Sequence, residues 1–130
     1  MKFLFDDNEI FVVEVEGVKF EVKPLTARTV DRVRRKHTKV RIERGERIED
    51  VDWIATNVEL FEMCVVNWEG VLDTKGNPRE CTPQNKRIFA EKNSQFAAKV
   101  VEKASNIEEL VNQEELKNSG PGQSGSSEAA

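Results

Sequence analysis

The residue types that most often carry chemistry are scarce in this chain. Its 130 residues include two cysteines, Cys64 and Cys81, and a single histidine, His37. A structural zinc site needs four ligands, and these three residues would need an added carboxylate at no recognisable spacing. The two thiols are therefore expected to be free, as is usual in a reducing cytosol. The sequence predicts no metal site and no bound cofactor.

Catalytic groups are equally hard to find. No cysteine–histidine pair suggests an activated nucleophile, and no two carboxylates have a setting that favours general acid–base catalysis. Lys75-Gly76 has the reverse order of a phosphate-binding loop. The run from Asp73 to Asn77 is not a calcium loop, because a lysine replaces one ligand and no glutamate closes the series. We therefore predict no catalytic residues and a protein that is not an enzyme.

Charge is concentrated in a basic stretch between residues 27 and 47. It holds nine lysines and arginines against three acids, a local charge of +6, whereas the whole chain carries −4. Three interpretations stay open: a solvated face, phosphate contacts to nucleic acid, or a docking face for an acidic partner or a second copy. The negative overall charge argues against nucleic acid as the partner.

The fold that positions these residues begins with strands. Alternating apolar residues over 10–15 and 18–22 flank Glu16-Gly17, which predicts an antiparallel β-hairpin with a short turn. An additional edge strand is expected at Phe3 and Phe5.

A first helix is predicted from about residue 27 to residue 44, with Thr26 as its N-cap and Gly45 as its stop. Its apolar stripe comprises Val30, Val33, His37 and Val40. A basic ridge on the opposite face comprises Arg28, Arg32, Arg35 and Lys39. His37 is expected to be a half-buried packing residue and not a ligand.

A second helix is predicted to start after Asp50 or Asp52, either of which can cap it, and to run to about Trp68. One apolar stripe comprises Val51, Ile54, Val58, Phe61, Val65 and Trp68, and a neighbouring stripe comprises Trp53, Leu60 and Cys64. An arc this wide must be covered on two sides. Two alternatives remain: the core of the chain's own domain, or a ridge or groove for a partner helix. Glu59 and Glu62 mark the solvent side.

The C-terminal half predicts further helices. Thr82-Pro83 is a strong helix start, a break is expected near Asn93-Ser94, and an amphipathic helix follows. Asn106 and Glu109 form a capping box that starts a last helical segment. Two alternatives stay open at Ser105-Asn106: a true break between two helices, or a kink within one. From Ser119 onward the sequence lacks large apolar residues, so disorder is expected.

The expected architecture is therefore a single α+β domain over residues 1–118 and a disordered tail over residues 119–130. The domain combines a small N-terminal antiparallel sheet with about four to five helices. The longest apolar run is only a few residues, and the N-terminus lacks the apolar core of a signal peptide. We expect no membrane association and a cytoplasmic location.

The loop after the second helix resembles a known family. The run Trp68-x-Gly70-Val71-x-Asp73-x-x-Gly76-Asn77-Pro78, followed by Cys81-Thr82-Pro83-Gln84-Asn85-Lys86, is similar to the central signature of tail assembly chaperones of long-tailed bacteriophages and prophages. The likeness spreads over about residues 10–115. Its signature residues are Trp68, Gly70, Asp73, Gly76, Asn77, Pro78 and Thr82. None of them is catalytic in that family, so the motif marks a fold.

The resemblance implies a binding function. Such chaperones coat the tape measure protein and keep it soluble until tail tube subunits polymerise around it. In that family a longer product of ribosomal frameshifting recruits the tail tube protein. The resemblance also implies action in the host cytoplasm and absence from the mature virion.

We hypothesise that the client binds the apolar ridge of the second helix, and that the basic ridge adds charge complementarity or self-association. The ridge residues are Ile54, Val58, Phe61, Val65, Trp68, Arg28, Arg32, Arg35 and Lys39. The alternatives are a small nucleic-acid-binding or regulatory phage protein using the basic helix over 27–47, or a structural subunit of the tail.

Overall fold

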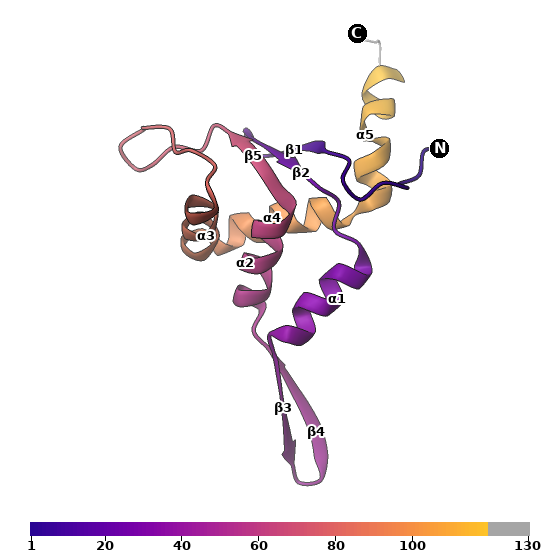
Figure 1. Cartoon of the computed structure of the whole chain (residues 1–130), viewed down its shortest axis with the longest axis vertical. Helices are drawn as coiled ribbons and strands as arrows, with labels where there is room; N and C mark the ends of the chain where they lie inside the picture. The colour runs from indigo at the N-terminus through magenta and orange to yellow at the C-terminus, as the bar shows by residue number, and fades with distance from the viewer. Residues whose placement is uncertain (120–130) are drawn as a thin grey trace.

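The computed structural model describes residues 1–119, with side chains described for residues 1–113. Within residues 1–119 the chain forms five strands and five helices, which confirms the predicted α+β class (Figure 1). The tail predicted over residues 119–130 begins at the last residue of the final helix and otherwise lies outside the described residues.

The strands lie in two separate antiparallel sheets, one of three strands and one of two. The strands are β1 (Phe11–Val15), β2 (Val18–Val22), β3 (Thr38–Glu43), β4 (Glu46–Val51) and β5 (Val65–Glu69). The helices are α1 (Ala27–Lys36), α2 (Trp53–Cys64), α3 (Pro83–Lys92), α4 (Ser94–Ser105) and α5 (Ile107–Ser119). None of the helices within residues 1–119 has both the length and the apolar composition that a bilayer crossing requires.

The predicted N-terminal hairpin is confirmed. Strands β1 and β2 pair through a two-residue turn in which Glu16 and Gly17 both have positive φ, 48° and 84°, as a type I′ turn requires. The additional edge strand predicted at Phe3 and Phe5 does not form, and both rings are exposed. Asp6 instead starts a turn, because its side chain accepts a hydrogen bond from the Asn8 backbone N–H.

The second helix is shorter than predicted, because the residues that follow it form the third strand of this sheet. Helix α2 ends at Cys64, and residues 65–69 form β5 beside β2. Val65 and Val66 are β-branched, which favours extended backbone, and pairing with β2 satisfies the polar groups along one edge of that backbone. Trp68 therefore lies on a strand, opposite Phe20, and does not end a helix.

The core is an aromatic cluster between this sheet and helices α2, α3 and α4. The Phe20 ring meets Phe61 and Trp68 edge-on, with centroids 6.0 Å and 6.5 Å away. Phe89 of α3 stacks on Phe61 at 5.3 Å. Offset and edge-to-face pairs of this kind add to the hydrophobic gain of burial. The cluster ties α2 to the sheet on one side and to α3 on the other.

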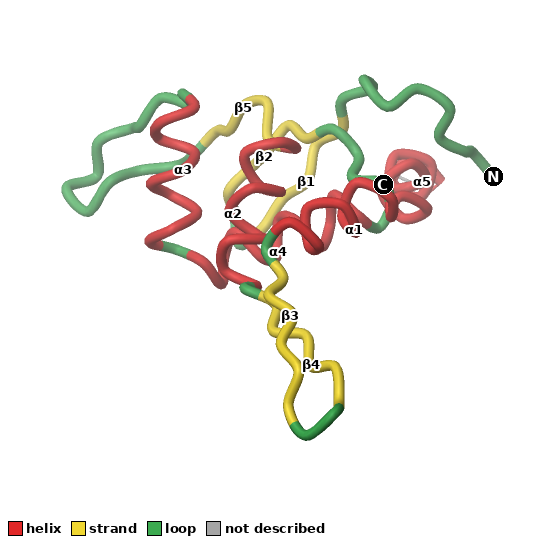
Figure 2. Tube along the Cα trace, turned by 60° about the horizontal axis from the view of Figure 1, so that its bottom comes forward, coloured by secondary structure: helices red, strands yellow, loops and turns green. Residues whose placement is uncertain are grey.

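A second hairpin replaces the end of the predicted basic helix. Helix α1 stops at Lys36, and strands β3 and β4 project from the body and pair with each other (Figures 1 and 2). Thr38, Val40 and Ile42 are β-branched and alternate with polar residues, which favours a strand. Arg44 and Gly45 both have positive φ, 54° and 80°. Gly45 therefore completes a hairpin turn and does not stop a helix.

The predicted helix starts and breaks in the rest of the chain are confirmed. Thr26, Asp52 and Thr82 accept backbone hydrogen bonds as N-caps of α1, α2 and α3. Helix α3 ends before Asn93, and α4 begins directly after it. Asn106 interrupts the helix as a true break, because its side chain accepts from the Glu109 N–H at the start of α5.

Candidate functional site

Four of the five apolar residues predicted to bind a partner lie in the chain's own core. They are Val58, Phe61, Val65 and Trp68, and none exposes more than 9% of its surface. The reason is that α2 is covered by the sheet, α3 and α4 at once, which accounts for most of its wide apolar arc. The predicted partner ridge is therefore largely covered by the chain itself at these four residues, of which only Val58 lines the groove described next. Ile54, in contrast, is 61% exposed.

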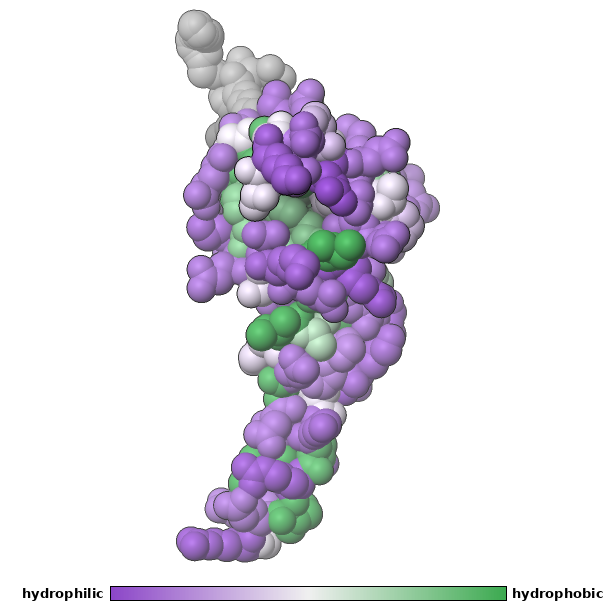
Figure 3. Space-filling view, turned by 90° about the vertical axis from the view of Figure 1, so that its left-hand side faces the viewer, coloured by the Kyte–Doolittle hydropathy of each residue, from purple (hydrophilic) through white to green (hydrophobic). Residues whose placement is uncertain are grey.

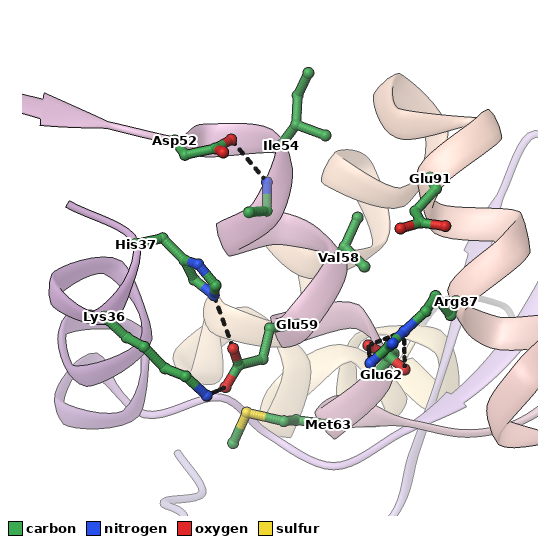
Figure 4. A pocket seen from close by; sticks show the side chains of 11 residues that line it. Lys36, His37, Asp52, Ile54, Val58, Glu59, Glu62, Met63, Arg87 and Glu91 are labelled. Atoms are coloured by element: carbon green, nitrogen blue, oxygen red, sulfur yellow. Dashed lines mark hydrogen bonds and ion pairs between the residues drawn. The ribbon is translucent and has the colours of Figure 1, made fainter. Parts of the chain in front are cut away.

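The outward side of α2 forms the floor of an open groove of about 740 Å³. The end of α1 lies on one side of this groove and α3 on the other (Figure 4). Its apolar floor consists of Ile54, Ala55, Val58 and Met63. Met63 is 41% exposed and was not predicted as a contact, because it lies outside both apolar stripes. Its spacing of four residues from Glu59 places it on the same side of the helix.

Charged side chains on the groove walls pair with one another. Glu59 lies 2.8 Å from His37 Nε2 and 3.2 Å from Lys36 Nζ, which bridges α2 to the end of α1. On the other side Arg87 of α3 pairs with Glu62 at 3.3 Å (Figure 4). His37 is half-buried, as predicted, but its ring contacts a carboxylate. Asp52 and Glu91 also line the groove and form no ion pair among the side chains of residues 1–113, and the pairs that do form leave the floor for apolar contact.

The Glu59 bridge predicts a pH dependence of stability. The hydrogen bond with His37, followed by the contacts with Lys36, holds the pKa of Glu59 below its ordinary value of 4.5. A carboxyl group with a lowered pKa in the folded state stabilises the fold above its unfolded-state pKa, and this contribution disappears as the pH falls through the folded-state pKa. Replacing Glu59 with glutamine is therefore expected to flatten the loss of stability between about pH 5 and pH 3.

Urea denaturation at a series of pH values measures this effect. Glu91→Gln is the matched control, since Glu91 also lines the groove and forms no ion pair among the side chains of residues 1–113. Parallel pH profiles for the natural chain and Glu59→Gln would contradict the prediction.

The signature residues build a closed loop between β5 and α3. The Asp73 carboxylate accepts hydrogen bonds from the backbone N–H groups of Lys75 and Asn77, at 2.9 Å and 3.0 Å. These bonds, with Asn77 the larger cause, lower the pKa of Asp73. Gly76 has a φ of 84° and donates to the Asp73 carbonyl. This left-handed conformation explains glycine at that position.

The ends of the loop are held by the remaining signature residues. The Trp68 indole N–H donates to the Arg79 carbonyl at 2.7 Å, and Pro78 forms a β-bridge with Leu72. Gly70 has a φ of 93°, and Thr82 caps α3. Every signature residue thus has a role in closing the loop or starting the next helix, so the motif specifies local structure.

Only three of the four residues predicted to form the basic ridge lie together. Arg28, Arg32 and Arg35 are exposed on α1 and line one shallow hollow together with Asp31. Lys39 does not join them, because it lies on β3 opposite Asp50. The basic helix over 27–47 proposed for nucleic-acid binding therefore does not exist as one helix.

Both cysteines are free, as predicted. Cys64 is fully buried, and burial raises the pKa of its thiol to about 12. Burial also raises the pKa of Cys81. Since the thiolate is the nucleophilic form, these surroundings do not activate either thiol.

Comparison with known proteins gives a family assignment. The family model described as YdaY prophage protein matches residues 21–120. No curated protein and no solved structure matches the chain. The matched segment runs from β2 past the end of α5 and includes both the groove and the signature loop. The phage origin implied by the signature is thus confirmed, and the chain belongs to the YdaY prophage protein family.

Proposed function

We propose that this protein is a non-enzymatic tail assembly chaperone, which binds the tape measure protein and keeps it soluble until tail tube subunits polymerise around it. The observation that carries the proposal is the groove on α2, with an apolar floor and with Glu59, Lys36, Glu62 and Arg87 of its walls already held in ion pairs. Such a groove fits the apolar face of an amphipathic helix.

The small size of the groove suits reversible binding of many copies along one client chain. A long helical client exposes apolar stripes before assembly, and each stripe must be covered along its length. The groove presents only Ile54, Met63 and a few neighbouring groups, so each copy offers a small contact. Small contacts exchange readily, and many copies along one chain still give strong overall coverage. Tube subunits are then able to displace the coat.

Two further observations support this function. The chain belongs to a prophage protein family, and its signature loop is similar to that of tail assembly chaperones. The proposal places the protein in the cytoplasm of the bacterial host and outside the mature virion. Recruitment of the tail tube protein is assigned to a longer frameshifted form of the chain.

Co-expression with the tape measure protein of the same prophage tests the proposal. We expect the tape measure protein to be insoluble alone and to be recovered in a soluble complex with this chain. An insoluble tape measure protein in the presence of the folded chain would contradict the proposal. Recovery of the chain from purified phage particles would instead identify a structural subunit of the tail.

A further inference from the structure

The projecting β3–β4 hairpin has one face on which apolar side chains are exposed. Val40 lies opposite Glu49 and Ile42 lies opposite Arg47, and directly opposite residues point to the same face of an antiparallel pair. Val40 is 50% exposed and Ile42 is 71% exposed. Figure 3 shows hydrophobic residues along the projecting part of the molecule, among hydrophilic ones. Two β-branched side chains on a freely projecting arm offer a site for apolar contact.

One ion pair joins this face to α1. Glu49, on the same face as Val40, lies 4.0 Å from Arg34 of α1. Arg34 also pairs with Asp31 at 2.6 Å, and Asp31 pairs with Arg35 at 2.5 Å. A continuous series of contacts therefore runs from the hairpin face to Arg35, an exposed arginine of the helix.

Helix α1 carries the net positive charge of this region. Helix α1 contains five basic residues and one acid, whereas the hairpin over residues 38–51 contains four of each. Arg28 and Arg32 are exposed and have no ion-pair partner among the side chains of residues 1–113. Positive charge is thus available on α1, and the hairpin that follows it in the chain has an apolar face with little net charge.

We propose that Arg28, Arg32, Arg35, Val40 and Ile42 form a second docking surface, here called the arm surface, for an acidic protein segment that carries apolar side chains. Acidic groups would pair with the free arginines, and apolar groups would cover Val40 and Ile42. The arm surface is separate from the groove on α2, so this inference goes beyond the proposed function. A two-stranded hairpin is marginally stable by itself, and a partner on this face would also stabilise it.

The same observations disfavour nucleic acid as the occupant. The face that carries Val40 and Ile42 also carries Glu49 and Arg47, so it adds no net positive charge along which a phosphate backbone could continue. Exposed isoleucine and valine contribute nothing to phosphate binding, which depends on lysine and arginine. Acidic protein segments, in contrast, can satisfy both the arginines and the apolar face.

The size of the arm surface sets the length of a suitable probe. Helix α1 is about 15 Å long at 1.5 Å per residue, and a six-residue strand spans about 20 Å. A helical peptide of about 20 residues covers most of this length. The probes are therefore a labelled leucine–glutamate amphipathic peptide, the same peptide with lysine in place of glutamate, and a DNA duplex of similar length.

Fluorescence anisotropy with the full chain tests the proposal. We expect the leucine–glutamate peptide to bind, and the double variant Arg28→Glu/Arg32→Glu to weaken its binding about tenfold or more. Ile42→Thr, which keeps a β-branched residue in the strand, is expected to weaken it as well. Ile54→Asp, in the groove, should leave it unchanged and so separates this proposal from the proposed function.

Several outcomes would overturn the proposal. They are tighter binding of the lysine peptide or of DNA, and the absence of any binding by the leucine–glutamate peptide. Concentration-dependent self-association of the natural chain, lost in Arg28→Glu/Arg32→Glu, would also overturn it, because the occupant would then be a second copy.

Discussion

Replacing Phe61 with alanine is expected to lower the free energy of unfolding by about 3–5 kcal/mol. The Phe61 side chain has no exposed surface. Its ring stacks on Phe89 and meets Phe20 edge-on, so truncation leaves a cavity at the junction of the sheet, α2 and α3. Small domains are stable by only about 5–15 kcal/mol, and the variant is therefore expected to be close to unfolding at physiological temperature.

Urea denaturation of the natural chain and two variants measures this effect. Ile54→Ala is the matched control on the same helix, and it should cost less than about 1 kcal/mol because that side chain is mostly exposed. Similar losses for Phe61→Ala and Ile54→Ala would contradict the assignment of Phe61 to the core. The expected result also means that lost client binding in a Phe61 variant reports unfolding and not a lost contact.

Replacing Ile54 with aspartate is expected to weaken client binding about 10- to 100-fold. Burial of an isoleucine side chain contributes about 1.5–3 kcal/mol, and each 1.4 kcal/mol corresponds to about tenfold in affinity. The substitution should leave the fold intact, because residue 54 is exposed and follows the Asp52 cap by two positions. An acid in the first turn of a helix is favourable to the helix dipole.

The readout is the amount of soluble tape measure protein after co-expression with each variant. Leu72→Asp is the matched control, since Leu72 is 56% exposed on the signature loop and does not line the groove. We expect Ile54→Asp to lose most of the soluble client and Leu72→Asp to retain it. Equal solubilisation by the two variants would remove the groove as the client site.

The elements that could be predicted from the sequence are those with a local chemical signal. Glu16-Gly17 between alternating strands predicts the first hairpin, and the turn has the expected positive φ values. Thr82-Pro83 predicts the start of α3 because a hydroxyl cap and an N1 proline act within one turn. The signature run was likewise placed in a loop, where Asp and Gly residues supply the backbone angles of a tight connector.

The second hairpin was missed although its signal is the same as that of the first. Arg44-Gly45 has the form of Glu16-Gly17, and Val40 and Ile42 alternate with polar residues. The spacing of Val30, Val33 and Val40 also fits the repeat of a helix, and this coincidence led to the prediction of a helix where a strand forms. The β5 strand was missed for another reason. Its partner β2 is more than forty residues away in the sequence, and no local sequence pattern indicates that pairing.

The groove could be predicted only in outline. The wide apolar arc of α2 correctly indicated a helix covered on more than one side, but not which stripe remains open. That outcome depends on how α3 and α4 pack, which leaves Ile54 and Met63 exposed and buries Phe61. The pairing of Glu59 with His37 likewise depends on where α1 ends.

The proposed function requires the client to place an apolar face in the groove on α2. Methyl NMR of the isoleucine-labelled chain, titrated with a soluble segment of the tape measure protein, detects that contact at Ile54. The chain has six isoleucines, at positions 10, 42, 48, 54, 88 and 107. We expect the Ile54 methyl resonance to shift on addition of the segment. A complex that shifts other methyl resonances and leaves Ile54 unchanged would contradict the claim.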